Sequence, residues 1–312
     1  MTQKLSRILV TGGAGFIGSH LVDWLAVDDA KVAVLDNFST GKIKNIEKHL
    51  RDKKIHLVKG DVCNFRLVKN LVSEVDAVVN LAAIVSVPYS IENPLLVHNV
   101  NATGTLNLLK ASLDSDVKRF VQASSAAVYG EAETLPVRED SVFRPVSPYA
   151  VSKIAAENYA RVFSCVYGLE TVCLRFFNVF GPRQAYNPYS GVITIFTNEL
   201  LHDRPPIVFG DGEQTRDFVS VHDVVSCCML ALTKEGIGGE AFNVSSGKAT
   251  TVNELVRLLQ KMTSKSNLEP THMNPRCGEI RHSWSSIDKA RTVLGYNPMV
   301  SLDEGLKEVL GY

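Results

Sequence analysis

Short runs of apolar residues alternate with amphipathic stretches through the first half of the chain. The apolar runs lie at positions 8–10, 32–35, 55–58, 76–81, 119–124 and 170–175. Apolar residues at helical spacing follow the first run, at 20–25. Near-continuous apolar strands separated by helices predict a parallel sheet that is covered by helices on both faces. Such a sheet binds ligands at the carboxyl ends of its strands, where the strand order reverses.

The alternation ends near Phe176, where Gly, Pro, Asn and aromatic residues begin to cluster, mainly at 181–191. Clusters of this composition are typical of loops. The later run at 217–221 resembles a return to the sheet, and 241–244 resembles another short strand. We therefore predict a second, smaller and discontinuous α/β domain. The first domain is expected at 1–175 plus about 217–241, and the second at about 176–216 plus 242–312.

The composition is that of an ordinary globular protein, with 45% hydrophobic and 21% charged residues among 312. Lys and Arg together number 33, as do Asp and Glu, so charge gives no argument for nucleic acid or a membrane as a partner. The six cysteines form neither a CxxC pair nor a zinc-type cluster with histidines. We therefore expect reduced thiols and no metal. With no export signal or membrane-length apolar run identified, we expect a cytoplasmic location.

A glycine-rich turn joins the first strand to the first helix. Gly12, Gly15 and Gly18 are spaced by three, which lets the backbone approach a pyrophosphate at the helix start. Asp36 follows 18 positions later, at the end of the second strand, where a carboxylate can accept both hydroxyls of an adenosine ribose. This pattern predicts a doubly wound sheet of the Rossmann type that prefers NAD to NADP. Asp36 could instead cap a turn, and Asp61, after the third strand, could contact adenine or simply form a turn.

Tyr149 and Lys153 lie four residues apart on a predicted helix that Ser147 caps. A phenol has a pKa of about 10, so it acts as a base near neutral pH only where a cation favours the phenolate. A bare YxxxK pattern is common by chance and usually marks a solvated helix face. Here Ser125 ends the strand before this helix, which makes an active site the more specific interpretation.

Further motifs of one family recur in order along the whole chain. Besides the glycine turn and Ser125, Tyr149 and Lys153, they lie at 36–41, 81–83, 99–101, 175–178, 212–218 and 275–279. With these motifs the chain resembles the extended short-chain dehydrogenases/reductases of the NAD-dependent epimerase/dehydratase family, which act on nucleotide sugars. The resemblance implies an isomerase, a 4-epimerase of UDP-sugars that uses NAD.

The resemblance also implies a role for each matching residue. Tyr149 is the expected base, Lys153 binds the nicotinamide ribose and lowers the tyrosine pKa, and Ser125 hydrogen-bonds the reacting hydroxyl. The hydride from sugar C4 goes to NAD, and the 4-keto sugar turns over before the hydride returns. The expected NAD contacts are Gly12, Gly15, Phe16, Ile17, Gly18, Asp36, Asn37, Ser39, Thr40, Gly41, Asp61, Val62, Leu81, Ala82, Ala83, Asn99, Tyr149, Lys153 and Phe176. The expected substrate contacts are Ser86, Ser125, Tyr149, Asn178, Val192, Phe209, Arg216, Arg276, Glu279 and Ser283.

Within this set, Arg216 and Arg276 would clamp the diphosphate, although from composition alone each is an ordinary surface arginine. Glu279, where the family more often has Asp, would reach the uridine ribose. Phe209 would stack on uracil or be a core aromatic. Ser283 stands where a bulky family residue excludes N-acetylated sugars, so the resemblance implies that UDP-GlcNAc and UDP-GalNAc are accepted, with UDP-Glc and UDP-Gal as further substrates.

The family pattern is not matched everywhere. Ala126 and Ala127 follow Ser125 where dehydratases and decarboxylases carry acidic residues, which favours simple epimerisation. Asn80 and Val85 stand where the family often has His and Lys. The alternatives are a UDP-glucuronate 4-epimerase, another nucleotide-sugar dehydratase or decarboxylase, and a non-catalytic dinucleotide sensor or scaffold.

Two predicted helices, near 94–113 and 148–167, carry apolar residues at helical spacing. We expect most of these residues to face the sheet. They are Leu106, Leu109, Leu113, Val151, Ala155, Tyr159, Val162 and Val166. Since members of the family often pair such helices across a four-helix interface, the resemblance implies a homodimer.

Overall fold

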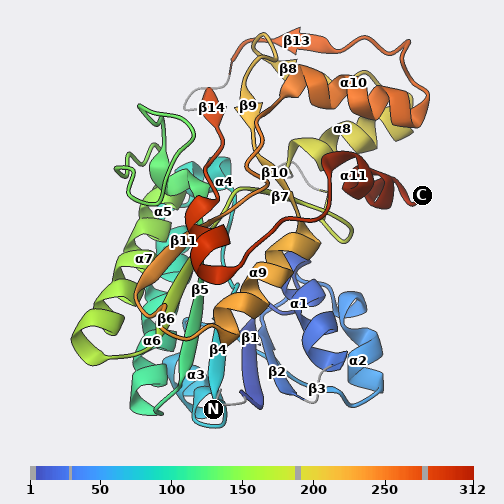
Figure 1. The fold of residues 1–312 in the computed structure, drawn as a ribbon. Coiled ribbons are helices and arrows are strands. Elements are labelled where there is room, and N and C mark those ends of the chain that lie inside the picture. The colour runs from blue at the N-terminus through green and yellow to red at the C-terminus, as the bar shows by residue number, and fades with distance from the viewer. Residues whose placement is uncertain (1–4, 28–29, 187–190, 276–279) are drawn as a thin grey trace.

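The computed structural model describes residues 5–27, 30–186, 191–275 and 280–312. A central sheet of seven parallel strands has the spatial order β11-β6-β5-β4-β1-β2-β3 (Figure 1). Its strands are β1 Arg7–Thr11, β2 Lys31–Asp36, β3 Ile55–Lys59, β4 Ala77–Asn80, β5 Arg119–Ser125, β6 Thr171–Phe176 and β11 Glu240–Val244. The order reverses between β1 and β4, which places the switch point there. The predicted α/β fold with a doubly wound parallel sheet is confirmed.

Helices cover both faces of this sheet, as expected for parallel strands. On one face, α1 (Phe16–Val27) and α9 (Val221–Thr233) pack together and contribute to one hydrophobic core. On the other face, α3 (Phe65–Val72), α6 (Gly104–Asp114) and α7 (Pro148–Tyr167) enclose a second core. In the part of the chain that the structure describes, no helix has the length and apolar character needed to cross a membrane. The cytoplasmic location stays a prediction.

Short helical segments join these elements. A π-helical turn at Asn99–Thr103 links α5 to α6 without a break. The other connecting segments are η1 Ile43–Asn45, α2 Glu47–Arg51, α4 Val87–Glu92, α5 Pro94–His98, the 3₁₀ turn η3 Ala126–Tyr129 and the π-helical turn η4 Ala290–Leu294.

A second group of elements lies apart from the central sheet, at the top of Figure 1. Its helices α8 (Val192–Leu201), α10 (Val252–Thr263) and α11 (Leu302–Leu310) share a separate core. Small sheets accompany them. These pair β7 Asn178–Phe180 with β10 Phe218–Ser220, β8 Ile207–Phe209 with β13 Thr271–Met273, and β9 Thr215–Arg216 with both β12 Thr250–Thr251 and β14 His282–Ser283.

The sequence-based expectation for the return to the central sheet was wrong in one detail. The run at 217–221 forms β10, which pairs with β7 outside the central sheet. The strand that does return is β11, which pairs with β6 at the edge of the central sheet. The expected domain boundary between residues 241 and 242 falls within β11, and the division into two domains stays a prediction.

The expectation for helix α7 was also wrong. Val151, Tyr159, Val162 and Val166 are exposed, and they point away from the sheet that they were expected to cover. Besides Phe163, which belongs to the second core, the buried face of α7 carries small residues and polar side chains that have partners inside the protein. For α6 the expectation holds, because Leu109 is fully buried and Leu106 and Leu113 pack against the same core.

Candidate active site

The glycine turn links the end of β1 to the start of α1. Gly12 has a φ of +67°, and its N–H donates to the carbonyl oxygen of Leu35 at 2.8 Å. A Cβ atom at Gly12 would lie 2.9 Å from the backbone nitrogen of Ala82, and one at Gly18 would lie 2.2 Å from the carbonyl oxygen of Gly12. Larger residues are therefore excluded at both positions. The turn presents the first N–H groups of α1, at Phe16 and Ile17, beside the switch point, as a pyrophosphate requires.

Asp36 ends β2 with its carboxylate beside this turn. One oxygen accepts from the backbone N–H of Ala14 at 2.9 Å, and the other accepts from that of Phe38 at 2.8 Å. Each oxygen can accept a further hydrogen bond from a hydroxyl group. A Cβ atom at Gly41 would lie 2.8 Å from the Asp36 carboxylate, so a glycine there keeps space beside it. The predicted residues Ser39 and Thr40 lie in the same loop.

Asp61 follows β3, the neighbour of β2. Its carboxylate accepts from the Asn37 amide at 2.8 Å and from the backbone N–H of Cys63 at 2.8 Å. The pKa of Asp61 is lowered, because these hydrogen bonds outweigh the opposing effect of its partial burial. The structure thus brings Asp36, Asn37 and Asp61 to one edge of the sheet, with Val62 buried beside them.

A buried hydrogen-bond network fixes the segment Leu81–Ala83 against β1. The Thr11 hydroxyl donates to the Asn80 amide oxygen at 2.6 Å and accepts from the backbone N–H of Ala82 at 3.3 Å. The Asn80 amide nitrogen donates to Gln122 at 2.9 Å and to Thr105 at 3.0 Å. An asparagine therefore joins the ends of β1, β4 and β5 at the position where the family pattern often has His.

Asn101 extends this network to helix α7. Its side chain accepts from the N–H of Ile84 at 2.8 Å, donates to the carbonyl oxygen of Ile84 at 2.9 Å, and donates to the Ser152 hydroxyl at 3.0 Å. Asn99, at the start of the π-helical turn, donates to the Cys63 sulfur at 3.4 Å. The predicted cofactor residues 61–62, 81–83 and 99 therefore border the carboxyl ends of β3 and β4.

Ser125, Tyr149 and Lys153 meet at the carboxyl end of β5. Ser125 is the last residue of β5, and Phe176 at the end of β6 lies opposite it in the strand register. Tyr149 is in the first turn of α7, which Ser147 caps by accepting from the N–H of Ala150. Its backbone N–H donates to the Ser90 hydroxyl of α4 at 3.1 Å. The Lys153 ammonium nitrogen lies 6.0 Å from the centre of the Tyr149 ring.

Burial perturbs both ionisable groups of this trio. The pKa of Lys153 is lowered from 10.5 to about 8, because its ammonium group is buried. This group donates a hydrogen bond to the carbonyl oxygen of Ala123. Burial raises the pKa of Tyr149, and a hydrogen bond with Ser125 partly opposes that rise. The Ser125 hydrogen bond thus acts against the burial that keeps the Tyr149 phenol protonated, and the predicted effect of the nearby Lys153 on this phenol stays a prediction.

Of the other predicted substrate residues in the described part of the chain, all but Ser86 lie in the second group of elements. Ser283 in β14 is paired in register with Arg216 in β9, and the Asn178 N–H donates to the carbonyl oxygen of Asp217 at 3.0 Å. The carbonyl oxygen of Phe209 accepts from Gln214 at 2.8 Å. Arg276 and Glu279 lie outside the described residues. Ser86 caps α4, and Val192 begins α8.

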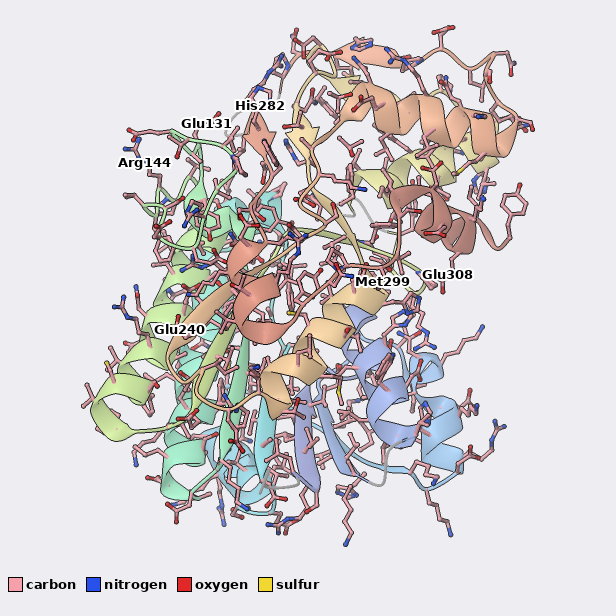
Figure 2. The ribbon with its side chains drawn as sticks, viewed as in Figure 1. Glu131, Arg144, Glu240, His282, Met299 and Glu308 are labelled. Atoms are coloured by element: carbon pink, nitrogen blue, oxygen red, sulfur yellow. The ribbon has the colours of Figure 1, made fainter. Side chains whose placement is uncertain are left out.

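The loop that follows Ser125 meets the strand that carries Ser283. Figure 2 shows Glu131 of this loop near His282 of β14. The N–H of Arg281 donates to the Glu131 carboxylate at 3.3 Å, and Val137 forms an isolated β-bridge with Ser285. The loop that follows Ser125 therefore contacts the residues on both sides of Ser283. The assignment of individual residues to NAD or to sugar stays a prediction.

Sequence reasoning missed several residues that hold this site together. Thr11, Ser90, Gln122 and Glu157 are buried polar residues with partners at the ends of the central strands. Glu157 was detectable, since it continues the spacing of Tyr149 and Lys153 by four more residues. The others lie inside apolar or loop segments, where their partners depend on the strand order.

Comparison with known proteins agrees with this geometry. Residues 9–309 match the family model of GDP-mannose 4,6 dehydratase. A putative UDP-glucose 4-epimerase of Methanocaldococcus jannaschii is 40% identical and is covered over 97% of its length by 98% of this chain. The solved UDP-N-acetylglucosamine 4-epimerase of Methanobrevibacter ruminantium M1, in complex with UDP-N-acetylmuramic acid, is 35% identical with a TM-score of 0.93, over 99% of this chain and 98% of that one. UDP-glucuronic acid 4-epimerase of Bacillus cereus, solved with UDP-glucuronic acid and NAD, is 33% identical with a TM-score of 0.92, over 98% of both chains.

A glycine turn at the switch point beside a group of Ser, Tyr and Lys at the end of β5 is typical of the extended short-chain dehydrogenase/reductase class. Within it, the chain belongs to the NAD-dependent epimerase/dehydratase family, of which the GDP-mannose 4,6-dehydratase model is a part. The family predicted from the motifs is confirmed, and so is the enzyme class, because the relatives are UDP-sugar 4-epimerases, which are isomerases.

Proposed function

We propose that this protein interconverts UDP-sugars at C4 with NAD as a retained cofactor. The observation that carries the proposal is the group of Ser125, Tyr149 and Lys153 at the carboxyl end of β5, in which Tyr149 and Lys153 are buried and Ser125 is half-buried. This group is separated from the glycine turn of β1 by β4 alone. The residues present fit NAD, since Gly12 and Gly18 permit the tight turn that brings the first N–H groups of α1 to the switch point, where a pyrophosphate would bind, and Asp36 can accept hydrogen bonds from ribose hydroxyls.

The chain's own residues would manage the proton in this reaction. Tyr149, as phenolate, would take the proton of the 4-hydroxyl group, while Ser125 would orient that hydroxyl. The charged Lys153 would favour the phenolate, as its position on the next turn of α7 allows. NAD, once bound, would supply the hydride acceptor. Return of the hydride to the opposite face of the 4-keto sugar, with return of the proton from Tyr149 to its oxygen, would complete the epimerisation and leave NAD oxidised as at the start.

The turn after Ser125 supports epimerisation over elimination of water. Ala126 and Ala127 open η3 directly after Ser125, and their methyl side chains have no proton to donate. Elimination needs an acid beside the leaving hydroxyl. We therefore favour epimerisation over the dehydratase and decarboxylase alternatives, and a UDP-glucuronate 4-epimerase is the alternative with the same type of reaction.

For the substrate, we propose that UDP-GlcNAc and UDP-GalNAc are interconverted, together with UDP-Glc and UDP-Gal. Ser283 is a small residue held beside Arg216 by strand pairing, and a small residue there leaves room for an N-acetyl group. Ser283→Tyr should reduce turnover of the N-acetylated pair at least about 100-fold, because a clash in the pocket excludes the larger sugar, and should leave the plain hexoses turned over. Ser283→Ala, which preserves the space, should keep the ratio between the two pairs. Equal loss on both pairs after Ser283→Tyr would refute the role of Ser283.

The proposed reaction is tested with the purified full-length protein and no added NAD. UDP-GlcNAc, UDP-Glc and UDP-glucuronate are incubated separately, and the products are resolved by chromatography. Epimers of the first two sugars are the expected result, and their formation without added cofactor would support retained NAD. Turnover of UDP-glucuronate alone would favour the glucuronate alternative. A protein inert on all three, with and without added NAD, would favour a dinucleotide-binding sensor or scaffold.

We also propose a homodimer formed through helices α5 and α7. Val151, Tyr159, Val162 and Val166 form an exposed apolar stripe along α7. A shallow hollow lined by Pro94, Leu95, His98, Pro148 and Val151 continues this stripe onto α5, where Leu95 is 86% exposed. Contiguous apolar surface of this kind is typical of an interface between subunits. The same helix would then connect the interface to Tyr149 and Lys153.

A further inference from the structure

The buried face of α7 continues beyond the two ionisable residues that the proposed reaction uses. Tyr149, Lys153 and Glu157 follow one another at intervals of four residues, so they lie on one face of the helix. Their exposed fractions are 7%, 3% and 5%. A carboxylate is rarely this deeply buried without a specific partner.

Lys153 and Glu157 contact consecutive residues at the end of β5. The Lys153 ammonium group donates to the carbonyl oxygen of Ala123 at 3.0 Å. The Ser124 hydroxyl donates to the Glu157 carboxylate at 2.6 Å. The next residue along β5 is Ser125. Helix α7 therefore holds the strand through two buried side chains immediately before the serine of the candidate active site.

Arg175 balances the buried charge of Glu157. It lies on β6 opposite Ser124 in the strand register, and its Nε atom is 3.1 and 3.2 Å from the two Glu157 oxygens. Both residues of this ion pair are at most 5% exposed. Removing one partner of such a pair is strongly destabilising, because the other charge stays buried without compensation. The ion pair thus gives Glu157 one fixed position.

The same arginine holds the turn that follows Ser125. Its Nη1 atom donates to the Tyr129 hydroxyl at 2.7 Å, and that hydroxyl donates to the Asn243 side chain at 2.6 Å. Tyr129 is the last residue of η3, which begins directly after Ser125. Ser125 is therefore bracketed on both sides by groups that depend on the pair of Glu157 and Arg175.

We propose that Glu157 is a positioning residue that sets the Ser125 hydroxyl against the Tyr149 phenol, acting through Ser124 and Arg175. This inference rests on the proposed function, because the distance between the Ser125 hydroxyl and the Tyr149 phenol matters only if both groups act on the reacting sugar. Glu157 itself contacts neither the phenol nor the reacting sugar. A hydrogen bond from Ser125 stabilises the Tyr149 phenolate, so displacement of Ser125 would raise the pKa of Tyr149.

Ser124→Ala tests this inference in the full-length holoprotein, since it removes the contact between Glu157 and β5 but keeps the ion pair. We expect kcat to fall about tenfold with KM changed less than twofold, because the alignment of the reacting groups is lost and sugar binding is not. The acidic limb of the kcat–pH profile should move to higher pH, since Tyr149 must lose its proton to act. Glu157→Gln is less suitable, because it would leave Arg175 buried beside a neutral group.

Thr171→Val is the matched control. The Thr171 hydroxyl donates to the carbonyl oxygen of Ala160 at 2.7 Å, so it too joins a strand to α7, but toward the other end of the helix. This variant should lower thermal stability about as much as Ser124→Ala, while kcat and the acidic limb stay where they are in the wild type. An equal shift of the limb in both variants would overturn the proposal, because the effect would then be general loosening of α7.

A second readout does not depend on turnover. The Tyr149 phenol is titrated by ultraviolet difference spectroscopy, with the Tyr149→Phe form of each protein as its blank. We expect Ser124→Ala to raise the Tyr149 pKa, and Thr171→Val to leave it unchanged. A wild type that turned over no UDP-sugar would refute the proposed function, yet the same titration shift would still support the positioning role. An active wild type with no shift in Ser124→Ala would overturn that role alone.

Discussion

The two faces of helix α7 reverse the usual relation between polarity and burial. The face toward the sheet carries Tyr149, Lys153 and Glu157, while the face toward solvent carries Val151 and Val162 among its apolar residues. A helix on the surface of a protein normally buries its apolar stripe. Here the buried polar groups have partners at the end of β5, and the exposed apolar groups belong to the proposed dimer interface. The contrast teaches that partners decide which face of this helix is buried.

The two faces also differ in what a substitution would disturb. On the buried face, each ionisable group has a proposed role in the reaction or in the alignment of the reacting groups, and burial of its charge lowers stability unless that charge is paired. On the exposed face, the apolar groups have no chemistry, and their replacement should change association alone. Substitutions on each face therefore test whether the two functions of α7 are separable.

The largest expected effect is on the buried face. Tyr149→Phe removes the base and should lower the rate of UDP-sugar interconversion about 10³-fold or more. NAD content and the melting temperature should stay close to those of the wild type, because the ring still fills its buried site. Product chromatography and cofactor absorbance measure the two effects. Retained epimerisation in Tyr149→Phe would show that another group takes the proton.

The next effect concerns the exposed face. Val162→Glu would place an unpaired carboxylate in the proposed interface, at a cost of about 3 kcal/mol or more, so the dimer should dissociate at least about 100-fold more readily. Sedimentation velocity across a concentration series measures this change. Trp24→Glu provides the control, because Trp24 is also an exposed apolar helix residue but lies on α1, across the sheet. A wild type that is monomeric at all concentrations would contradict the proposed interface.

Much of the site was predictable because it depends on backbone geometry. The positions of Gly12, Gly18 and Asp36 follow from an apolar strand, a turn and a helix in that order, and the family resemblance implies that Ser125 lies beside Tyr149. The inverted burial of α7 was not predictable from periodicity, since apolar spacing alone does not tell which stripe meets the sheet. The strand that returns to the central sheet was missed for a related reason. The runs at 217–221 and 241–244 are both short and apolar, and only their pairing partners show that the second one joins the central sheet.

The smallest expected effect returns to the buried face and concerns stability. In the unfolded chain Lys153 keeps the ordinary pKa of 10.5, whereas in the folded protein its pKa is about 8. At pH 7 both states carry the charge, and burial of that charge disfavours folding by roughly 3 kcal/mol, at about 1.4 kcal/mol for each pKa unit. Lys153→Met should therefore abolish activity but stabilise the cofactor-free protein by about 2 kcal/mol, once the lost bond to Ala123 is counted. From about pH 8 to 10.5 the folded wild type loses this proton while the unfolded chain keeps it, so the wild type gains stability and the difference should shrink. Urea unfolding at pH 7 and pH 9.5 measures the difference, and a gain of equal size at both values would show that the buried charge is not its cause.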